Sequence, residues 1–528
     1  MGSTNQVPTP PPEGGFYSRV SPAQAAADAI PILVDDIYHL FHLTTPPFTK
    51  HHPPRLRSCW WRLQSKDLVH WTRDVEPSIK PGESPTAPDA DGAWTGAAVL
   101  GPDGNMNIFY TGYNLSENGK QVILRAKSTD AHGTKFDYPG KEISFNGDGR
   151  DKLEHIDFRD PYVFFNKEES QYWMIIASRL ASGPHWSRGC IALLKSTDLD
   201  TWTFAPNPLY SPNDMFCPEC PELFSLPNGK WYLVYSRFHA PNAGTVYRIA
   251  DSPYGPFRIP RDGTHGRLDG RRWYAAKSCP KAGDPSKRIY FGWIGDYLED
   301  ERKWLWAGDL AVPREVSADS NGFLQVRPAI GVEGLFRETS EAVSTDIVSS
   351  QISLSSPGTT TAVFPELNIN ETQDILLTFE VQDCDSHSFG IILQADNTQK
   401  GHRLQFTPCG ERTYTITLHT DFPPLDDFWA DQYKLHLPRP VDGPEITRHE
   451  NVLLTGAVTL LLRNQLLEFF CGGRSISFRL PISTSKAVNE EAEQATADRR
   501  LGWFVEDGNV ELNSVSIRYG GQVTKTSM

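Results

Sequence analysis

Short runs of β-branched and aromatic residues recur through the first 335 residues of the chain, and tight turns often precede them. Runs of four or five such residues between turn signals are typical of β-strands, and no helical pattern of useful length interrupts them. The runs are Tyr38–Phe41, Asn107–Tyr110, Tyr172–Ile176, Trp231–Tyr235 and Ile289–Trp293. This pattern restricts the chain to an all-β architecture.

A second signal recurs with the first. A serine followed two residues later by aspartate or a turn occurs at Ser65, Ser128, Ser196 and Ser252, at spacings of 63, 68 and 56 residues. A Ser-x-Asp pair can bind its own turn backbone, and the Trp or Phe that follows would begin the next strand. One unit per roughly 60 residues is a longish version of a four-stranded propeller blade. We therefore predict a five-bladed β-propeller; a coincidence of common turn residues is the alternative.

The pattern changes between about residues 326 and 344. Beyond this point longer runs alternate between apolar and polar residues, as in Ile375–Val381 and Tyr414–Leu418. Such alternation with turns between the runs is typical of an antiparallel β-sandwich. The predicted organisation is a disordered lead-in over residues 1–20, the propeller over 21–338 and the sandwich over 345–528. Residues 423–440 and 486–498 are predicted to be surface loops.

The charge of the chain limits its partners. The formal net charge is −14, which argues against nucleic acid or an anionic membrane and favours a neutral or cationic small ligand. No apolar run is long enough to span a membrane. The polar, Pro-rich start does not resemble a secretory signal, so we expect a cytoplasmic protein whose eight cysteines are reduced. The oligomeric state is left open.

Three acidic residues stand next to β-type runs in the propeller half. Asp28 precedes Ala29–Val34, Asp160 precedes Pro161–Phe165, and Glu219 lies between two cysteines and two prolines. If all three sit at the start of the innermost strand of a blade, they crowd together around the central channel. A partly desolvated carboxyl such as Glu219 has a raised pKa, as a general acid requires.

With these acids in place, the chain resembles glycoside hydrolase family 32, which comprises invertases, inulinases, levanases and fructosyltransferases. Arg159-Asp160-Pro161 and Glu219-Cys220 in this order are the most specific pieces. The other matching pieces are Tyr38–Phe41, Trp60 with Ser65–Trp71, Gly92–Gly96, Trp273–Lys277, Gly292-Trp293 and Ala311–Glu315. The resemblance covers residues 20 to 335 well and the second half in outline, through Leu462–Asn464, Glu468–Phe470 and Gly472–Arg474.

The resemblance implies a role for each acid. Asp28 would be the nucleophile, Asp160 the transition-state stabiliser and Glu219 the acid/base of a retaining β-fructofuranosidase. Arg159 would keep Asp160 ionised, and Asp269 with Lys277 would reach an acceptor sugar. The predicted substrate-binding residues are Arg159, Trp60, Trp94, Thr95, His42, Tyr274, Lys277 and Trp293. No residues demand a metal or an organic cofactor.

The chain departs from the family pattern around its proposed nucleophile. The family usually has Asn-Asp-Pro-Asn-Gly where this chain has Ala27-Asp28-Ala29-Ile30-Pro31, and Tyr-Gln where it has His42-Leu43. The missing amide contacts to fructose leave open the substrate range and the balance between water and sugar as acceptor. Asp35 and Asp36 are rival nucleophiles, although they fall where a turn is expected.

Other functions remain as alternatives. Cys217 and Cys220 could form a redox pair or half of a zinc site, but no second pair follows at ligand spacing. A five-bladed inverting glycosidase of the arabinanase or xylosidase type, an exo-acting inulinase or levanase, and a catalytically silent sugar-binding propeller also fit parts of the pattern. We expect cleavage of sucrose and short fructo-oligosaccharides, with fructosyl transfer as a second outcome.

Overall fold

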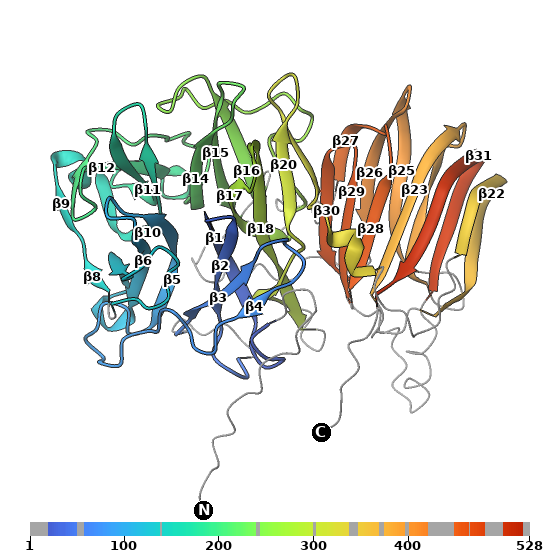
Figure 1. Ribbon diagram of the computed structural model, residues 1–528. Helices are drawn as coiled ribbons and strands as arrows, with labels where there is room; N and C mark the ends of the chain where they lie inside the picture. The colour runs from blue at the N-terminus through green and yellow to red at the C-terminus, as the bar shows by residue number, and fades with distance from the viewer. Residues whose placement is uncertain are drawn as a thin grey trace, which may run out of the picture.

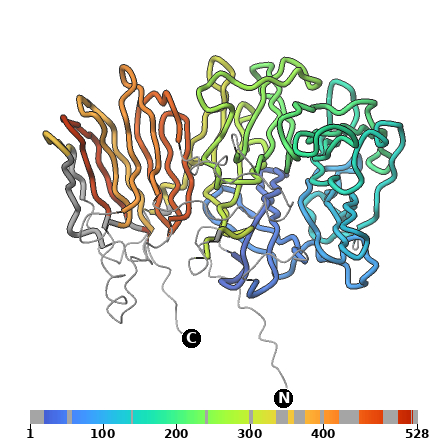
Figure 2. Tube along the Cα trace, turned by 180° about the vertical axis from the view of Figure 1, so that it is seen from behind, coloured from blue at the N-terminus to red at the C-terminus, as the bar shows by residue number. Residues whose placement is uncertain are grey.

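The structure is a computed structural model that describes residues 19–49, 57–137, 140–238, 243–298, 303–336, 347–368, 374–395, 401–420, 448–463, 465–480 and 500–520. Strands β1–β21 form one body and strands β22–β31 a second body beside it (Figure 1), and the view from behind shows the same division (Figure 2). Most of the predicted lead-in and the predicted loops 423–440 and 486–498 lie outside the described residues.

The first body is built from groups of antiparallel strands. The first group is β1 (Ala26–Val34), β2 (Ile37–Thr44), β3 (Cys59–Ser65) and β4 (Thr72–Arg73). The second is β5 (Gly92–Leu100), β6 (Met106–Asn114), β7 (Lys120–Lys127) and β8 (Lys141–Glu142). The third is β10 (Leu153–Asn166), β11 (Gln171–Leu180), β12 (Gly189–Ser196) and β13 (Thr201–Phe204), with β9 (Ser144–Asn146) parallel to β13.

The remaining strands close this body on itself. A three-stranded sheet holds β14 (Glu219–Ser225), β15 (Trp231–Arg237) and β16 (Gly244–Ala250). After it come β17 (Trp273–Lys281), β18 (Asp284–Leu298), β19 (Lys303–Leu310), β20 (Arg314–Ala318) and β21 (Leu324–Pro328). Strand β19 pairs with both β18 and β1, so the first and last groups merge into one nine-stranded sheet. The architecture is the expected β-propeller, while the count of five blades stays a prediction.

The predicted β-runs are strands, and the predicted Ser-x-Asp turns form. Each of the five runs lies in the second strand of its group, that is, in β2, β6, β11, β15 or β18. The Ser65 hydroxyl accepts from the backbone N–H of Leu68 at 2.9 Å, and Asp67 accepts from Val69 and His70. The same bonds recur from Ser196 and Asp198. The repeat is therefore a turn device that ends one strand and begins the next.

The strands β1, β5, β10, β14 and β17 pack against one another in cyclic order around the centre of the propeller. Each of these inner strands carries a register shift, or β-bulge, within its first half. A bulge leaves one residue unpaired and re-aims its side chain. The residues at or beside these bulges are Asp28, Thr95, Asp160, Cys220 and Ala275.

The second body is a β-sandwich of long strands. Its strands are β22 (Ile347–Asn368), β23 (Ile375–Cys384), β24 (Ser388–Ala395), β25 (His402–Gly410), β26 (Thr413–His419), β27 (Arg448–Leu453), β28 (Val458–Arg463), β29 (Leu466–Cys471), β30 (Arg474–Arg479) and β31 (Arg500–Tyr519). Strand β31 pairs with β24 through its first part and with β23 through its last part, so one strand serves both layers. Phe379, Phe406 and Trp503 are among the buried rings between them.

Helical segments in the described ranges are short 3-10 turns: η1 (Leu115–Glu117), η2 (Asp148–Lys152), η3 (His185–Ser187) and η4 (Val332–Phe336). Across this described part of the chain, no helix reaches the length and apolar character that a membrane span needs.

Candidate active site

The structure brings the three predicted acids together at the centre of the propeller. Cys220 connects two of them: its backbone N–H donates to Asp160 Oδ2 at 2.9 Å, and its Sγ lies 3.7 Å from Asp160 Oδ2 and 3.9 Å from Asp28 Oδ2. Glu219 directly precedes Cys220 on β14. All three carboxyls are more than nine-tenths buried. Asp28 and Glu219, 191 positions apart in the chain, thus share one site.

Their place within the strands differs from the prediction. Asp28 is the third residue of β1, and Asp160 lies well inside β10, whereas we expected each to precede its strand. Only Glu219 begins its strand. Asp160 has a φ of 57°, a left-handed conformation that Asp tolerates better than most residues, and its N–H donates to Thr111 Oγ1 at 2.8 Å. The bulges, rather than the strand ends, present these acids.

Asp28 receives its hydrogen bonds from neutral groups. Thr95 Oγ1 donates to Asp28 Oδ2, and the indole Nε1 of Trp293 donates to Oδ1 at 2.8 Å. Burial raises the pKa of Asp28 to about 6, with a smaller contribution from the charge of Asp160, while the two hydrogen bonds act in the opposite direction. Near neutral pH Asp28 is largely ionised, and both of its oxygens are held in place.

Glu219 is held from two sides. Arg159 Nη2 donates to Oε1 at 2.9 Å, and the Tyr274 hydroxyl donates to Oε2 at 2.6 Å. Burial raises the pKa of Glu219 to about 7; Arg159 opposes this shift and the charge of Asp160 adds to it. A carboxyl with this pKa can both give and take a proton near neutral pH, as an acid/base group must.

The strongest contacts of Arg159 are not with Asp160. Its Nη1 donates to Asp157 at 2.6 Å and its Nη2 to Glu219, whereas its Nε lies 3.8 Å from Asp160 Oδ2. The predicted pairing of Arg159 with Asp160 is thus present, at 3.8 Å, beside shorter contacts that were not predicted. The guanidinium joins Asp157 to Glu219.

Lys277 contacts the backbone of a neighbouring inner strand. Its Nζ donates to the carbonyl of Gly96 at 2.7 Å, next to Thr95, and the side chain is buried. A Cβ on Gly96 would lie 1.8 Å from the carbonyl oxygen of Phe109, so only glycine fits there. The charge of Lys277 also lowers the pKa of Asp28, against the effect of burial. In this structure Lys277 therefore holds the backbone of β5 beside Thr95.

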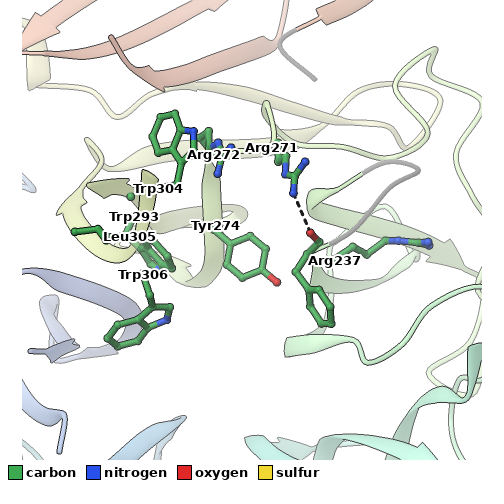
Figure 3. Close-up of a pocket in the computed structure, with 10 residues that line it drawn as sticks. Arg237, Arg271, Arg272, Tyr274, Trp293, Trp304, Leu305 and Trp306 are labelled. Carbon is green, nitrogen blue, oxygen red and sulfur yellow. Dashed lines mark hydrogen bonds between the residues drawn. The ribbon is translucent and has the colours of Figure 1, made fainter. Parts of the chain in front are cut away.

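A pocket opens beside the two acids that carry raised pKa values. Tyr274 and Trp293 contact Glu219 and Asp28, and both rings also line the pocket (Figure 3). The two rings meet edge to face with centroids 5.9 Å apart, and Trp306 continues the wall. The full lining is Arg237, Phe238, Arg271, Arg272, Tyr274, Trp293, Gly295, Trp304, Leu305 and Trp306. Aromatic faces and arginine donors in one pocket suit the apolar and hydroxyl faces of a sugar.

Two predicted substrate contacts lie in the protein interior instead. The Trp60 side chain is fully buried and its indole donates to the carbonyl of Trp94 at 3.1 Å. His42 is fully buried, with Nδ1 beside Thr44 and Arg73 Nη1 donating to Nε2 at 2.9 Å. Burial, with the charge of Arg73, lowers the pKa of His42 to about 3, so the ring stays neutral. Neither side chain is placed to meet a sugar.

Four further predicted residues take other positions. Trp94 is half-buried, and its ring stacks on that of Tyr113 with the centroids 4.1 Å apart. The rival acids Asp35 and Asp36 form the turn after β1, at the far end of the strand from Asp28. Asp269 binds Arg314 at 2.5 Å and the sandwich residue Ser477, so it does not face an acceptor sugar.

Some contributors to the site were not predicted. Asp157 and Arg179 continue the ion pairs that begin at Glu219, and Arg237 and Trp306 line the pocket. Asp157 could have been found, because residues two apart in a strand share a face and it stands two before Arg159. Arg237 and Trp306 carry no comparable signal.

Cys217 and Cys220 are both buried, and burial raises the pKa of each thiol well above its ordinary value. Within the described residues no cluster of His, Cys, Asp and Glu is arranged to hold a metal ion.

The fold and the site together define a carbohydrate-active type of protein: a β-propeller with three central carboxyls, followed by a β-sandwich. Comparison with known families agrees. Residues 29–328 match the profile described as "Glycosyl hydrolases family 32 N-terminal domain", more than half of the chain. The chain therefore belongs to glycoside hydrolase family 32. The match begins one residue after Asp28, so it does not by itself test that position.

Individual relatives share about a quarter of their aligned residues with this chain. The β-fructofuranosidase insoluble isoenzyme CWINV1 of Arabidopsis thaliana is 26% identical over 319 residues, 55% of this chain and 52% of that protein. The raffinose invertase of Escherichia coli is 27% identical over 358 residues, 61% of this chain and 71% of that protein. The chain thus spans about half the length of the plant relatives it matches.

Among solved structures, fructan 1-exohydrolase IIa from Cichorium intybus is similar with a TM-score of 0.67 at 17% identity, covering 97% of this chain and 98% of that one. Sucrose-6-phosphate hydrolase from Lactobacillus gasseri also has a TM-score of 0.67, at 16% identity, covering 97% and 94%. At these identities the likeness establishes the propeller-plus-sandwich fold alone.

Proposed function

We propose that this protein is a retaining β-fructofuranosidase that cleaves sucrose and short fructo-oligosaccharides. The observation that carries the proposal is the pair of buried carboxyls, Asp28 and Glu219, which have different partners and are each hydrogen-bonded to a side chain, Trp293 or Tyr274, that lines one aromatic pocket. Family membership supports the reaction class, because the matched relatives are named as fructofuranosidases, invertases and a fructan exohydrolase.

In the first step, protonated Glu219 gives its proton to the glycosidic oxygen. The bond from that oxygen to the anomeric carbon of fructose breaks as Asp28 Oδ forms a bond to the same carbon. The leaving sugar departs with the proton, and the fructosyl unit is held as an ester on Asp28. Asp160 stabilises the positive charge that develops on the fructosyl ring. The Thr95 and Trp293 contacts keep Asp28 oriented for attack.

In the second step, Glu219 acts as a base. It takes a proton from water, whose oxygen bonds to the anomeric carbon while the ester bond to Asp28 breaks. The hydrogen bonds from Arg159 and Tyr274 favour the carboxylate that this step needs. A sugar hydroxyl in place of water gives fructosyl transfer, which we propose as a second outcome.

Incubation of the purified protein with concentrated sucrose tests the proposal. Equal amounts of free fructose and glucose mean hydrolysis, and a fructose deficit with a new trisaccharide means transfer. NMR of the first-formed fructofuranose reports the anomer: retention is expected, and the inverted anomer would contradict the double-displacement mechanism. Consumption of inulin or levan alone would favour the exo-fructanase alternative, and no consumption of any of these would favour a silent binding propeller.

A cytoplasmic location is proposed from the sequence alone. Microscopy of a chain carrying a C-terminal fluorescent tag would test it, with diffuse cytoplasmic signal expected.

A further inference from the structure

Asp157 lies between two arginines at the edge of the active site. Its Oδ1 accepts from Arg159 Nη1 at 2.6 Å and its Oδ2 from Arg179 Nη1 at 3.1 Å. Asp157 is buried, with a relative exposure of 4% for the residue and 6% for its side chain. The other terminal nitrogen of Arg159 donates to Glu219. One terminal nitrogen of the Arg159 guanidinium therefore binds Glu219, the acid/base candidate, and the other binds Asp157.

Asp157 is itself held in place from outside. Arg179 Nη1 also pairs with Glu154 at 2.9 Å, Glu154 pairs with Arg188, and the Arg179 guanidinium lies 3.8 Å from the centre of the Phe216 ring. The chain of alternating charges runs from Glu219 toward the rim of the propeller. Because both oxygens of Asp157 are engaged, it cannot swing away from Arg159 without breaking a second ion pair.

The charge balance around Glu219 depends on this arrangement. Strand β10 brings Arg159 and Asp160 to Glu219, and strand β17 brings Tyr274. Asp157 and Arg179, from β10 and β11, lie on the side of Arg159 away from Glu219. The segment that contains Glu219 adds the thiols of Cys217 and Cys220. Strand β15 contributes the backbone of Ser236. Arg159 is the cation in contact with Glu219, so a carboxylate that shares Arg159 weakens its pull on the Glu219 proton.

We propose that Asp157 is a positioning residue: it holds the Arg159 guanidinium and takes up part of its positive charge, so that Glu219 keeps the proton for the first step. This inference rests on the proposed function, in which Glu219 is the general acid. The burial of Glu219 and its raised pKa agree with a proton held near neutral pH. Asp157 touches no reacting atom in this scheme and acts only through Arg159.

The test is the pH dependence of kcat/KM for sucrose in Asp157→Asn. Without the Asp157 charge, Arg159 favours the Glu219 carboxylate more strongly, so the alkaline limb moves to lower pH, by roughly half a unit or more. Activity below the limb stays within about three-fold of the original protein. With fructosyl fluoride, whose leaving group needs no proton from Glu219, the fructosylation step should show no alkaline limb from Glu219 in either protein.

Arg179→Gln is a second variant with the opposite expected sign. It frees Asp157 to pair with Arg159 alone, which weakens the contact of Arg159 with Glu219 and moves the alkaline limb to higher pH. Glu468→Gln is the matched control, because Glu468 is also a buried carboxylate between two arginines, 2.7 Å from Arg463 and 3.6 Å from Arg314. It lies at the contact with the sandwich and should lower the melting temperature without moving the pH profile.

Equal loss of activity at every pH in Asp157→Asn, or shifts of the same sign in both variants, would overturn the inference and leave Asp157 a structural residue. If Asp157→Asn does not fold, the shift of the alkaline limb in Arg179→Gln tests the inference by itself: a shift to higher pH supports it, and no shift or a shift to lower pH overturns it. Glu219→Gln distinguishes a failure of the proposed function from a failure of the role of Asp157. Full sucrose cleavage in that variant refutes the proposed function. Loss of cleavage there with an unmoved limb in Asp157→Asn refutes only the role of Asp157.

Discussion

Two of the buried clusters of charged side chains in the described residues are composed differently. At the contact between propeller and sandwich, Asp269 and Glu468 stand against Arg314 and Arg463. Each of these carboxylates also accepts backbone N–H bonds, from Ser477 to Asp269 at 2.7 Å and from Val312 to Glu468 at 3.0 Å. Charges and donors are balanced there.

At the centre of the propeller the acids have fewer cationic partners. Asp28 takes its hydrogen bonds from Thr95 and Trp293, which are neutral, and Glu219 shares Arg159 with Asp157. Burial raises the pKa of Asp28 and of Glu219. The comparison teaches that a buried carboxyl whose pairing is incomplete has the raised pKa that acid/base chemistry uses, whereas a fully paired buried cluster should lose stability when one partner is removed.

Asp28→Asn should give the largest effect. Removal of the nucleophile lowers kcat on sucrose by about 10⁴-fold or more, by analogy with nucleophile deletions in other covalent enzymes. The melting temperature should stay the same or rise, because the variant no longer buries an unpaired charge. Asp35→Asn, in the exposed turn after β1, serves as the control with unchanged kcat. Retention of turnover in Asp28→Asn would remove Asp28 from the mechanism.

Glu468→Gln tests the paired cluster. Breaking a buried ion pair costs about 3–5 kcal/mol of the free energy of unfolding, because Arg463 and Arg314 lose their shared partner. Denaturant titration measures the loss, and kcat on sucrose should change by less than about two-fold in the folded fraction. If stability is kept while activity falls, the two clusters do not differ as we describe.

Tyr274→Phe should have an intermediate effect. It removes the hydrogen bond to Glu219 Oε2, which favours the carboxylate, so the pKa of Glu219 rises further. The step in which Glu219 acts as base should slow by about ten-fold, as expected for the loss of one hydrogen bond to a charged group. Steady-state kcat and the build-up of fructosyl-enzyme measure this; a fall in kcat/KM with unchanged kcat would contradict it.

The smallest effect is on stability as a function of pH. Asp28 and Glu219 bind protons more tightly in the folded protein than in the unfolded chain, whose ordinary pKa values are 3.8 and 4.5. The stability that they contribute is full below those values and is lost as pH rises through about 6 and about 7. Between pH 5 and 8 the melting temperature should fall less in the combined Asp28→Asn, Glu219→Gln variant than in the original protein. Identical slopes would mean that neither carboxyl holds a shifted proton.

The sequence predicted the strands, the turns and the meeting of the acids, because these depend on local signals that repeat. Ser65 with Asp67 binds its own turn as expected, and Asp160 and Glu219 were placed by the motifs around them. The bulges were not predicted, since a register shift depends on the partner strand as well as on the strand that bulges. Pro161 and Pro221, which directly follow the bulge residues Asp160 and Cys220, are local hints.

The side chains that were predicted less well illustrate the same limit. His42 and Trp60 stand in family-like motifs, yet the alternation of their strands directs them into packed interior positions. Arg159 was paired with its neighbour in sequence, whereas its nearest partners are Asp157 and Glu219, the latter 60 residues away. Sequence adjacency predicts which residues a site contains more readily than which atoms meet.

The most direct measurement is to identify the residue that carries the fructosyl unit. Glu219→Ala, treated with fructosyl fluoride and quenched, should accumulate an ester because its second step lacks the base. Peptide mapping by mass spectrometry should find one fructosyl unit on the peptide that contains Asp28, and none in the combined Asp28→Asn, Glu219→Ala variant. Label on another acid, or steady release of fructose with the inverted anomer and no label, would contradict the mechanism.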